Sequence, residues 1–199
     1  PGAPLYLLGH SLGGQLATAY AGLRREADLQ GLIFVASGTP YYRTWGFPGR
    51  PILWIVARLF PWIADRVGHF PGRRIGFATR EARTVMRDWA TLIRDGVFRL
   101  RNWEGPDLEE GIAEVELPIL SITLEKDISV PKHAAEHMLA KMPRARVERW
   151  HWDPEAEGLP RTHHVRWPRR AEPVVERIVN WLGARPTPGA TASSGGLLS

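Results

Sequence analysis

The chain has 199 residues and a formal net charge of +5, and 44% of its residues are hydrophobic and 24% charged, a balance typical of globular proteins. No apolar run approaches the ~20 residues of a membrane-spanning helix, so we expect no transmembrane segment. The absence of cysteine excludes disulfides, thiolate metal sites and cysteine nucleophiles. The chain begins with Pro1 instead of methionine, which indicates processing or a partial sequence. As a separate expectation, we place the protein in the cytoplasm.

The basic residues are mostly arginines, and acids are interspersed among them. Arg24-Arg25-Glu26 and residues 80–83 are examples. A nucleic-acid groove instead gathers its basic residues on one face. The pattern therefore favours a solvated arginine-rich surface, and we expect no nucleic-acid partner.

The first predicted elements form a strand–helix–strand unit. Residues 5–8 are a continuous apolar run, as in a strand that is buried on both faces, and residues 9–14 form a glycine-rich turn. Apolar residues then recur at helical spacing: Leu12, Leu16, Ala19, Tyr20 and Leu23. Gly31 ends the connection, and residues 32–36 predict a second buried strand. Such a unit favours parallel pairing.

Residues 39–111 break this pattern and predict a helical lid. Five prolines interrupt the segment between positions 40 and 71. Residues 52–67 are apolar enough for a helix that is interrupted or kinked at Pro61. A second helix is expected from an N-cap at Thr79 to a stop at Gly96.

The sheet resumes after the lid. Residues 117–124 and 145–152 predict two more strands, and Pro131 opens a helix between them that extends to about Lys141. A last helix starts at Glu172, just before a proline that suits its first turn, and stops at Gly183. Its expected core stripe is Val174, Val175, Ile178, Val179 and Leu182.

These elements predict an α/β fold with a mainly parallel sheet and a helical lid insertion. Residues 1–38 and 112–183 would form the core, and residues 39–111 the lid. Residues 184–199 consist mainly of Pro, Gly, Ser, Thr and Ala without periodicity, so we expect a disordered tail.

Gly9-His10-Ser11-Leu12-Gly13 matches the G-x-S-x-G nucleophile elbow and lies between a predicted strand and a predicted helix. Such a turn raises a serine hydroxyl above the sheet, and we expect Gly9 and Gly13 to leave room for neighbouring backbone that a β-carbon would block. We therefore expect Ser11 to be a catalytic nucleophile. The backbone N–H of Leu12, at the positive end of the helix, would be one oxyanion donor.

A serine nucleophile needs a base and an acid that orients the base. In folds that carry this elbow, the three residues follow along the chain in the order serine, acid, histidine. Asp127 comes just after the 117–124 strand, which places it at the same sheet edge as Ser11, and Glu125 is the alternative acid. The base is expected between the last strand and the last helix. His164 is preferred there, and His163 is the alternative base.

Two other histidines fit the role of base poorly. His10 lies inside the elbow and would point away from the serine. His151 comes too early, on or at the end of a strand.

The chain from residue 5 to residue 183 resembles the second half of an α/β-hydrolase. Residues 69–76 and 87–90 resemble a lidded group of predicted α/β-hydrolases without a defined substrate. That resemblance implies a base in a His-x-x-aromatic arrangement, which His164 to Trp167 matches, although His163 stands where a glycine is usual.

The same resemblance implies that about four strands precede the elbow strand and that the loop after the third strand donates a second oxyanion N–H. We therefore expect a partial sequence of a larger enzyme, inactive or poorly folded alone, with a hydrophobic sheet edge at residues 5–8.

A competing motif occurs at residues 133–137, which match the zinc pattern H-x-x-E-H through His133, Glu136 and His137. No clear third ligand follows. We therefore expect no metal and no cofactor.

The predicted function is hydrolysis of an ester or thioester through an acyl-enzyme. The lid's tryptophans and leucines favour a small-molecule substrate with an apolar acyl chain, and the sequence leaves the oligomeric state open. Two alternatives remain: an acyltransferase of the same fold, and a non-catalytic binding protein that keeps the fold.

Overall fold

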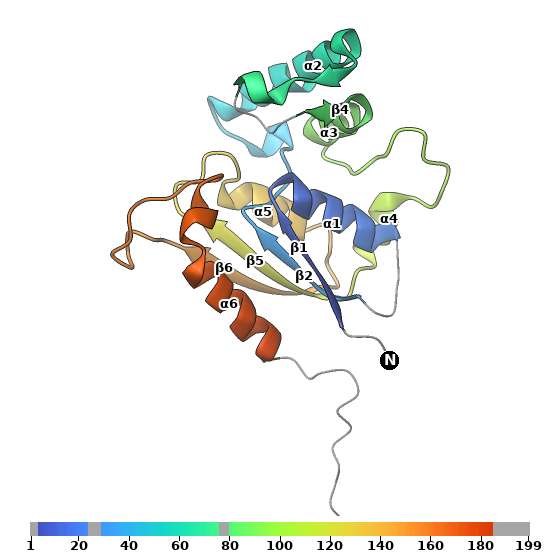
Figure 1. Cartoon of the computed structure of the whole chain (residues 1–199). Coiled ribbons are helices and arrows are strands. Elements are labelled where there is room, and N and C mark those ends of the chain that lie inside the picture. The colour runs from blue at the N-terminus through green and yellow to red at the C-terminus, as the bar shows by residue number, and fades with distance from the viewer. Residues whose placement is uncertain (1–3, 24–28, 76–79, 185–199) are drawn as a thin grey trace, which may run out of the picture.

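The computed structural model describes residues 4–23, 29–75 and 80–184. Its main sheet has the order β1 (Leu5–His10), β2 (Leu29–Val35), β5 (Pro118–Leu124) and β6 (Arg146–Trp152), and every neighbouring pair is parallel (Figure 1). The predicted α/β fold with a mainly parallel sheet is therefore confirmed. The predicted cap at Thr79 and all but the first residue of the predicted tail (184–199) lie outside the described residues.

The two central strands are apolar because both of their faces are covered. In β2 and β5 nearly every residue is buried, as expected for a sheet with helices on both sides. β1 lies at the edge of the described sheet, and Leu5 and Leu8 are 42% and 53% exposed. The expectation that residues 5–8 are buried on both faces was wrong, whereas the hydrophobic edge expected at these residues is present in the described sheet. β2 also begins at Leu29, three residues before the predicted strand and inside the predicted connection.

Alternate residues of the strands separate the core into two layers. One contains Leu32, Phe34 and Ile119 and packs on α1 (Leu12–Leu23), α4 (Leu108–Ala113) and α5 (Lys132–Leu139). The other contains Ile33, Val35 and Ile122 and packs on α6 (Glu172–Gly183). Helices therefore cover both faces of the sheet, so the ends of the central strands are where a ligand site can form.

α6 buries a narrower stripe than its sequence predicts. Val174 and Trp181 are buried, but Val175 and Val179 are 50% and 57% exposed, so these two were wrongly assigned to the core. The buried pair is seven residues apart, which is two turns of one helix face. Valine at a helix position therefore does not by itself predict that the position faces the core.

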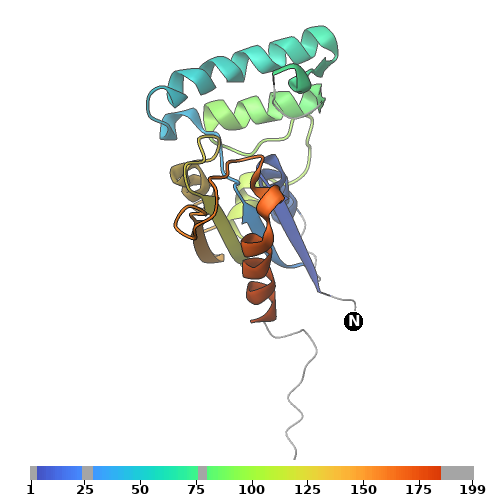
Figure 2. The same ribbon diagram turned by 60° about the vertical axis from the view of Figure 1, so that its left-hand side comes forward.

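A separate helical layer stands beyond the carboxyl ends of the strands (Figures 1 and 2). α2 (Gly49–Val67) packs against α3 (Arg83–Asp95) through small clusters of their own, around Ala57 with Ala90 and around Ala64 with Met86. Pro61 lies inside α2 without interrupting it. A short antiparallel pair, β3 (His69–Phe70) with β4 (Glu81–Ala82), accompanies the helices.

The end of α3 follows local chemistry. Gly96 ends α3 in a left-handed conformation with φ of 72°, which glycine adopts at helix ends at little cost.

α4, part of which was assigned to the lid, packs against α1 instead. The division into a core and a lid remains a prediction. Single 3₁₀ turns occupy Tyr42–Thr44, Gly72–Ile75 and Trp167–Arg170.

Candidate active site

Ser11 occupies the sharp turn between β1 and α1. Its φ of 54° is uncommon for a residue with a side chain, and such strain persists only where the surroundings impose it. Two contacts impose it here. The Ser11 N–H donates to the Val35 carbonyl at 3.2 Å, and the Ser11 carbonyl accepts from the Ser37 hydroxyl at 2.6 Å. The turn is therefore tied to the end of β2.

Glycines permit this turn, but not all of those expected to do so. A β-carbon on Gly9 would lie 2.4 Å from the Gly14 nitrogen, and one on Gly14 would lie 2.1 Å from the Ser37 hydroxyl oxygen. A β-carbon on Gly13 would meet nothing within 4 Å. The space-making role predicted for Gly13 was wrong, because its α-carbon faces open space and Gly14 is the residue that packs against β2.

His164 lies between Ser11 and Asp127. Its Nε2 is 2.8 Å from the Ser11 hydroxyl oxygen, and its Nδ1 is 2.8 Å from Asp127 Oδ2. The other oxygen of Asp127 accepts the N–H groups of Ser129 and Val130, at 2.8 and 3.1 Å. The Asp127 side chain is fully buried, so its remaining acceptor is directed at the imidazole.

These contacts specify the chemistry that the group can perform. A carboxylate can only accept, so His164 Nδ1 carries the proton in this arrangement and Nε2 has a free lone pair. The Ser11 hydroxyl can donate to that lone pair. An imidazole held in this way can take up the serine proton while the carboxylate stabilises the resulting positive charge.

The alternative site residues lie elsewhere. His163 is exposed, and its carbonyl accepts the N–H groups of Arg166 and Trp167, which turns the chain after the histidine pair. Glu125 accepts a hydrogen bond from His151 Nε2 at 2.8 Å, and His151 Nδ1 lies 2.8 Å from the Thr123 hydroxyl. Glu125 and His151 therefore join β5 to β6 and do not reach Ser11.

His10 contacts the candidate base, a contact that sequence reasoning missed. Its Nε2 donates to the His164 carbonyl at 2.9 Å, and its ring centre is 4.9 Å from that of His164. Burial, followed by repulsion from His164, lowers the pKa of His10. It is thus neutral at pH 7 and adds no positive charge beside the base. The elbow motif leaves this position unspecified, so no pattern indicated the contact.

A cavity of about 440 Å³ opens beside Ser11. Leu12, Val130, Ala134 and Val165 form an apolar part of its wall. The helical layer contributes Trp89 from α3, and β4 contributes Glu81. The cavity is therefore lined both by the elbow, through Ser11 and Leu12, and by the helical layer, through Trp89 of α3.

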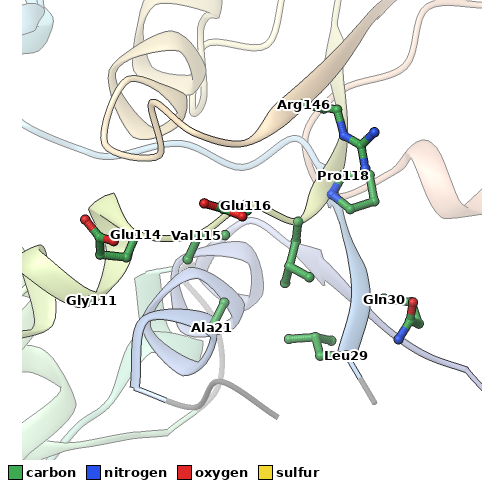
Figure 3. Close-up of a pocket in the computed structure, with 10 residues that line it drawn as sticks. Ala21, Leu29, Gln30, Gly111, Glu114, Val115, Glu116, Pro118 and Arg146 are labelled. Atoms are coloured by element: carbon green, nitrogen blue, oxygen red, sulfur yellow. The ribbon is translucent and has the colours of Figure 1, made fainter. Parts of the chain in front are cut away.

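A second cavity, of about 380 Å³, lies at the other end of the strands, where β2, β5 and β6 begin (Figure 3). Leu29, Pro118 and Arg146 in its wall are the first residues of β2, β5 and β6. No serine, threonine or histidine is among the residues that line it. It lacks a nucleophile with a base, so the cavity at Ser11 is the candidate active site.

The residues of the H-x-x-E-H match have other partners. Glu136 forms an ion pair with Arg149 at 2.9 Å, and His137 Nδ1 lies 2.6 Å from the Thr39 hydroxyl. His133 packs perpendicular to the Trp45 ring. Over residues 4–23, 29–75 and 80–184, no three His, Asp or Glu side chains are grouped to hold a metal ion. The zinc alternative therefore has no ligand set here.

The sequence model of the alpha/beta hydrolase family matches residues 1–177. The chain belongs to this family. Membership accounts for the parallel sheet and for a turn of the elbow type after its first described strand. No curated protein matches the sequence.

Solved structures of the same fold include three hydrolytic enzymes. An esterase from Exiguobacterium antarcticum aligns with 17% identity and a TM-score of 0.50, over 92% of this chain and 68% of its own. A hydrolase from Oleispira antarctica aligns with 14% identity and a TM-score of 0.53, over 92% and 66%. A monoacylglycerol lipase from Paleococcus ferrophilus has 14% identity and a TM-score of 0.50, over 91% and 68%. The chain thus spans about two thirds of the length of these three proteins.

In the part of the chain that the structure describes, no helix has the length and apolar character to cross a bilayer.

Proposed function

We propose that this α/β-hydrolase cleaves an ester or thioester through an acyl-enzyme on Ser11. The observation that carries the proposal is the position of His164, 2.8 Å from the Ser11 hydroxyl on one side and 2.8 Å from Asp127 on the other. A serine is a weak nucleophile at neutral pH unless a base accepts its proton. The buried carboxylate of Asp127 is the acid that orients this base.

In the proposed reaction, Ser11 Oγ attacks the substrate carbonyl as its proton passes to His164 Nε2. Asp127 holds the Nδ1–H and stabilises the imidazolium. The Leu12 N–H, which opens α1, stabilises the negative oxygen of the tetrahedral intermediate. When this collapses, His164 returns the proton to the leaving alcohol or thiol. Water then attacks the acyl-serine with the same base, and the acid and free Ser11 are released.

The walls of the cavity favour an uncharged, apolar acyl group. Val130, Ala134, Val165 and Trp89 offer apolar surface close to Ser11. Glu81 lies in the same wall and would repel an acyl chain that ends in a carboxylate. The cavity volume of about 440 Å³ is in the range of small-molecule sites. Small apolar esters and thioesters are therefore the proposed substrates.

Labelling by a fluorophosphonate, which reacts with activated serines, tests the proposal. We expect the full-length protein to be labelled and Ser11→Ala to lose the label completely. Ser129→Ala is the matched control, because Ser129 lines the same cavity and should keep the label. A folded wild-type protein that stays unlabelled would favour the non-catalytic alternative. If the wild type is labelled, product analysis with water alone and with an added alcohol separates hydrolysis from acyl transfer.

A further inference from the structure

α2 presents an apolar face to solvent. Five large side chains on it are each between 43% and 53% exposed: Ile52, Trp54, Ile55, Leu59 and Trp62. α2 lies on the side of α3 that faces away from the sheet, as both ribbon views show (Figures 1 and 2). Its inner side already packs on α3 through Ala57 and Ala64. The outer face is therefore a surface of its own, and apolar patches of this kind mark interaction sites.

The segment that contains α2 is strongly basic, and α2 itself carries Arg50, Arg58 and Arg66. Residues 39–83 contain eight arginines and two acids, a larger excess of positive charge than the +5 of the whole chain. One of the two acids, Asp65, is paired with Arg87 of α3 at 2.7 Å. The other is Glu81, in the wall of the Ser11 cavity. Positive charge on α2 itself is therefore almost uncompensated.

Arginine and tryptophan alternate along α2 at intervals of four residues. Arg50, Trp54, Arg58, Trp62 and Arg66 follow one another at this spacing. The Arg58 guanidinium lies 3.6 Å from the centre of the Trp54 ring, and that of Arg66 lies 4.9 Å from the centre of the Trp62 ring. Each stack holds a cation and an aromatic ring together at the surface. The face thus offers apolar surface and cations side by side.

We propose that the outer face of α2 docks on an anionic lipid surface. A helix that lies in a bilayer interface combines large apolar side chains with basic residues, whereas a spanning helix excludes charge. Tryptophan rings favour the depth of the lipid headgroups. A guanidinium matches the geometry of a lipid phosphate, which it can bind through two N–H groups. This docking goes beyond the proposed hydrolysis and does not depend on it.

Charge argues against a second copy of the chain as the occupant. A symmetric dimer through this face would place the same patch on both sides, and Arg58 and Arg66 would then oppose arginines of the partner with one paired acid nearby. Like charges across an interface are unfavourable. An anionic bilayer has the opposite charge and an apolar layer beneath it, so it complements both properties of the face.

Co-sedimentation of the full-length protein with vesicles tests the docking. We expect binding to mixed phosphatidylcholine–phosphatidylglycerol vesicles, weak binding to phosphatidylcholine alone, and binding that weakens as salt rises. Arg58→Gln with Arg66→Gln should lower the partition coefficient about 30-fold, from the usual contribution of a basic residue at such a surface. Trp62→Glu should lower it at least as much. Fluorophosphonate labelling in the absence of lipid should be unchanged in both variants.

Matched controls remove equal charge or apolar surface elsewhere. Arg169→Gln with Arg170→Gln removes two exposed arginines near α6, and Val179→Glu alters an exposed apolar residue of α6. Both should bind the vesicles as the wild type does. Equal losses in the control and α2 variants would overturn the proposal, and so would absence of binding by the wild type. Self-association that Trp62→Glu abolishes, without vesicle binding, would assign the face to a second copy.

Discussion

His164 Nε2 lies 2.8 Å from Ser11 Oγ although 153 positions of the sequence separate the two residues. The two ends of the described core therefore meet at one point, at the carboxyl edge of the sheet. Ser11 follows β1 and Asp127 follows β5, while His164 enters from the segment after β6. In a parallel sheet these strand ends share one edge, which is where ligands bind in open α/β folds.

The two neighbouring histidines should differ sharply in their effects. His164→Ala removes the group that accepts the Ser11 proton, so we expect the ester hydrolysis rate to fall about 10³-fold or more and fluorophosphonate labelling to become undetectable. His163→Ala should keep both within a few-fold, because His163 is exposed. Rates and labelling are compared for the two purified variants. Loss of activity in His163→Ala alone would refute the assignment of the base.

The two candidate acids form a second matched pair. Asp127→Asn keeps the oxygen that accepts the Ser129 and Val130 N–H groups, so the loop should fold. The amide cannot hold the Nδ1 proton of His164, and we expect kcat to fall about 10³- to 10⁴-fold. Glu125→Gln should affect kcat little, because Glu125 binds His151. Steady-state kinetics with one activated ester distinguishes them, and equal losses in both variants would contradict the assignment.

Two glycines of the elbow should respond oppositely to alanine. Gly9→Ala places a methyl group 2.4 Å from the Gly14 nitrogen, so we expect the free energy of unfolding to fall by about 1 to 3 kcal/mol. Gly13→Ala meets nothing within 4 Å and lies in α1, where alanine should raise the free energy of unfolding by about 0.5 to 1 kcal/mol. Urea unfolding measures both. A tolerated Gly9→Ala would mean that the turn can move away from the 2.4 Å approach to the Gly14 nitrogen.

Stability should fall as the pH is lowered below about 6.5. Burial is the main cause that lowers the pKa of His10 and of His137 from the ordinary value of 6.5. Above pH 6.5 both residues are neutral in the folded and unfolded chains. Below it the unfolded chain takes up protons that the folded chain resists, so unfolding is favoured. The stability is fully present above pH 6.5 and decreases towards the lower pKa values of the folded state.

Urea unfolding at several pH values tests this dependence. The double variant His10→Gln, His137→Gln should show a shallower loss of unfolding free energy below pH 6.5 than the wild type. The same change at the exposed His163 is the control. An unchanged pH dependence in the double variant would exclude these two histidines as its source.

The sequence alone was sufficient for the elements whose signals are local. The run of apolar residues in β2 and β5, the glycine that ends α3 and the proline at the start of α6 act within a few residues of themselves. The elbow motif is equally local, since strand, turn and helix are contiguous. The resemblance to α/β-hydrolases rested on this elbow and on residues 69–76 and 87–90, and the family match bears it out.

Other features depend on contacts between distant segments. Gly13 and Gly14 are adjacent, and only the approach of Ser37 shows that Gly14 is the constrained one. Val175 and Val179 have core-like side chains, but α6 turns Trp181 to the sheet instead. The contact of His10 with the His164 carbonyl joins residues 154 positions apart. Hydrophobic periodicity describes one element at a time, so it carries no information on such pairs.

The sequence by itself determined that a serine elbow, a carboxylate after β5 and a pair of histidines before α6 belong to one sheet edge. That followed from the strand–turn order, because parallel strands end at the same side. Only the tertiary structure decided that His164, and not His163, approaches Ser11, and that Glu125 binds His151. The physical reason is that successive side chains of one segment point in different directions, and packing against distant residues selects which one enters the site.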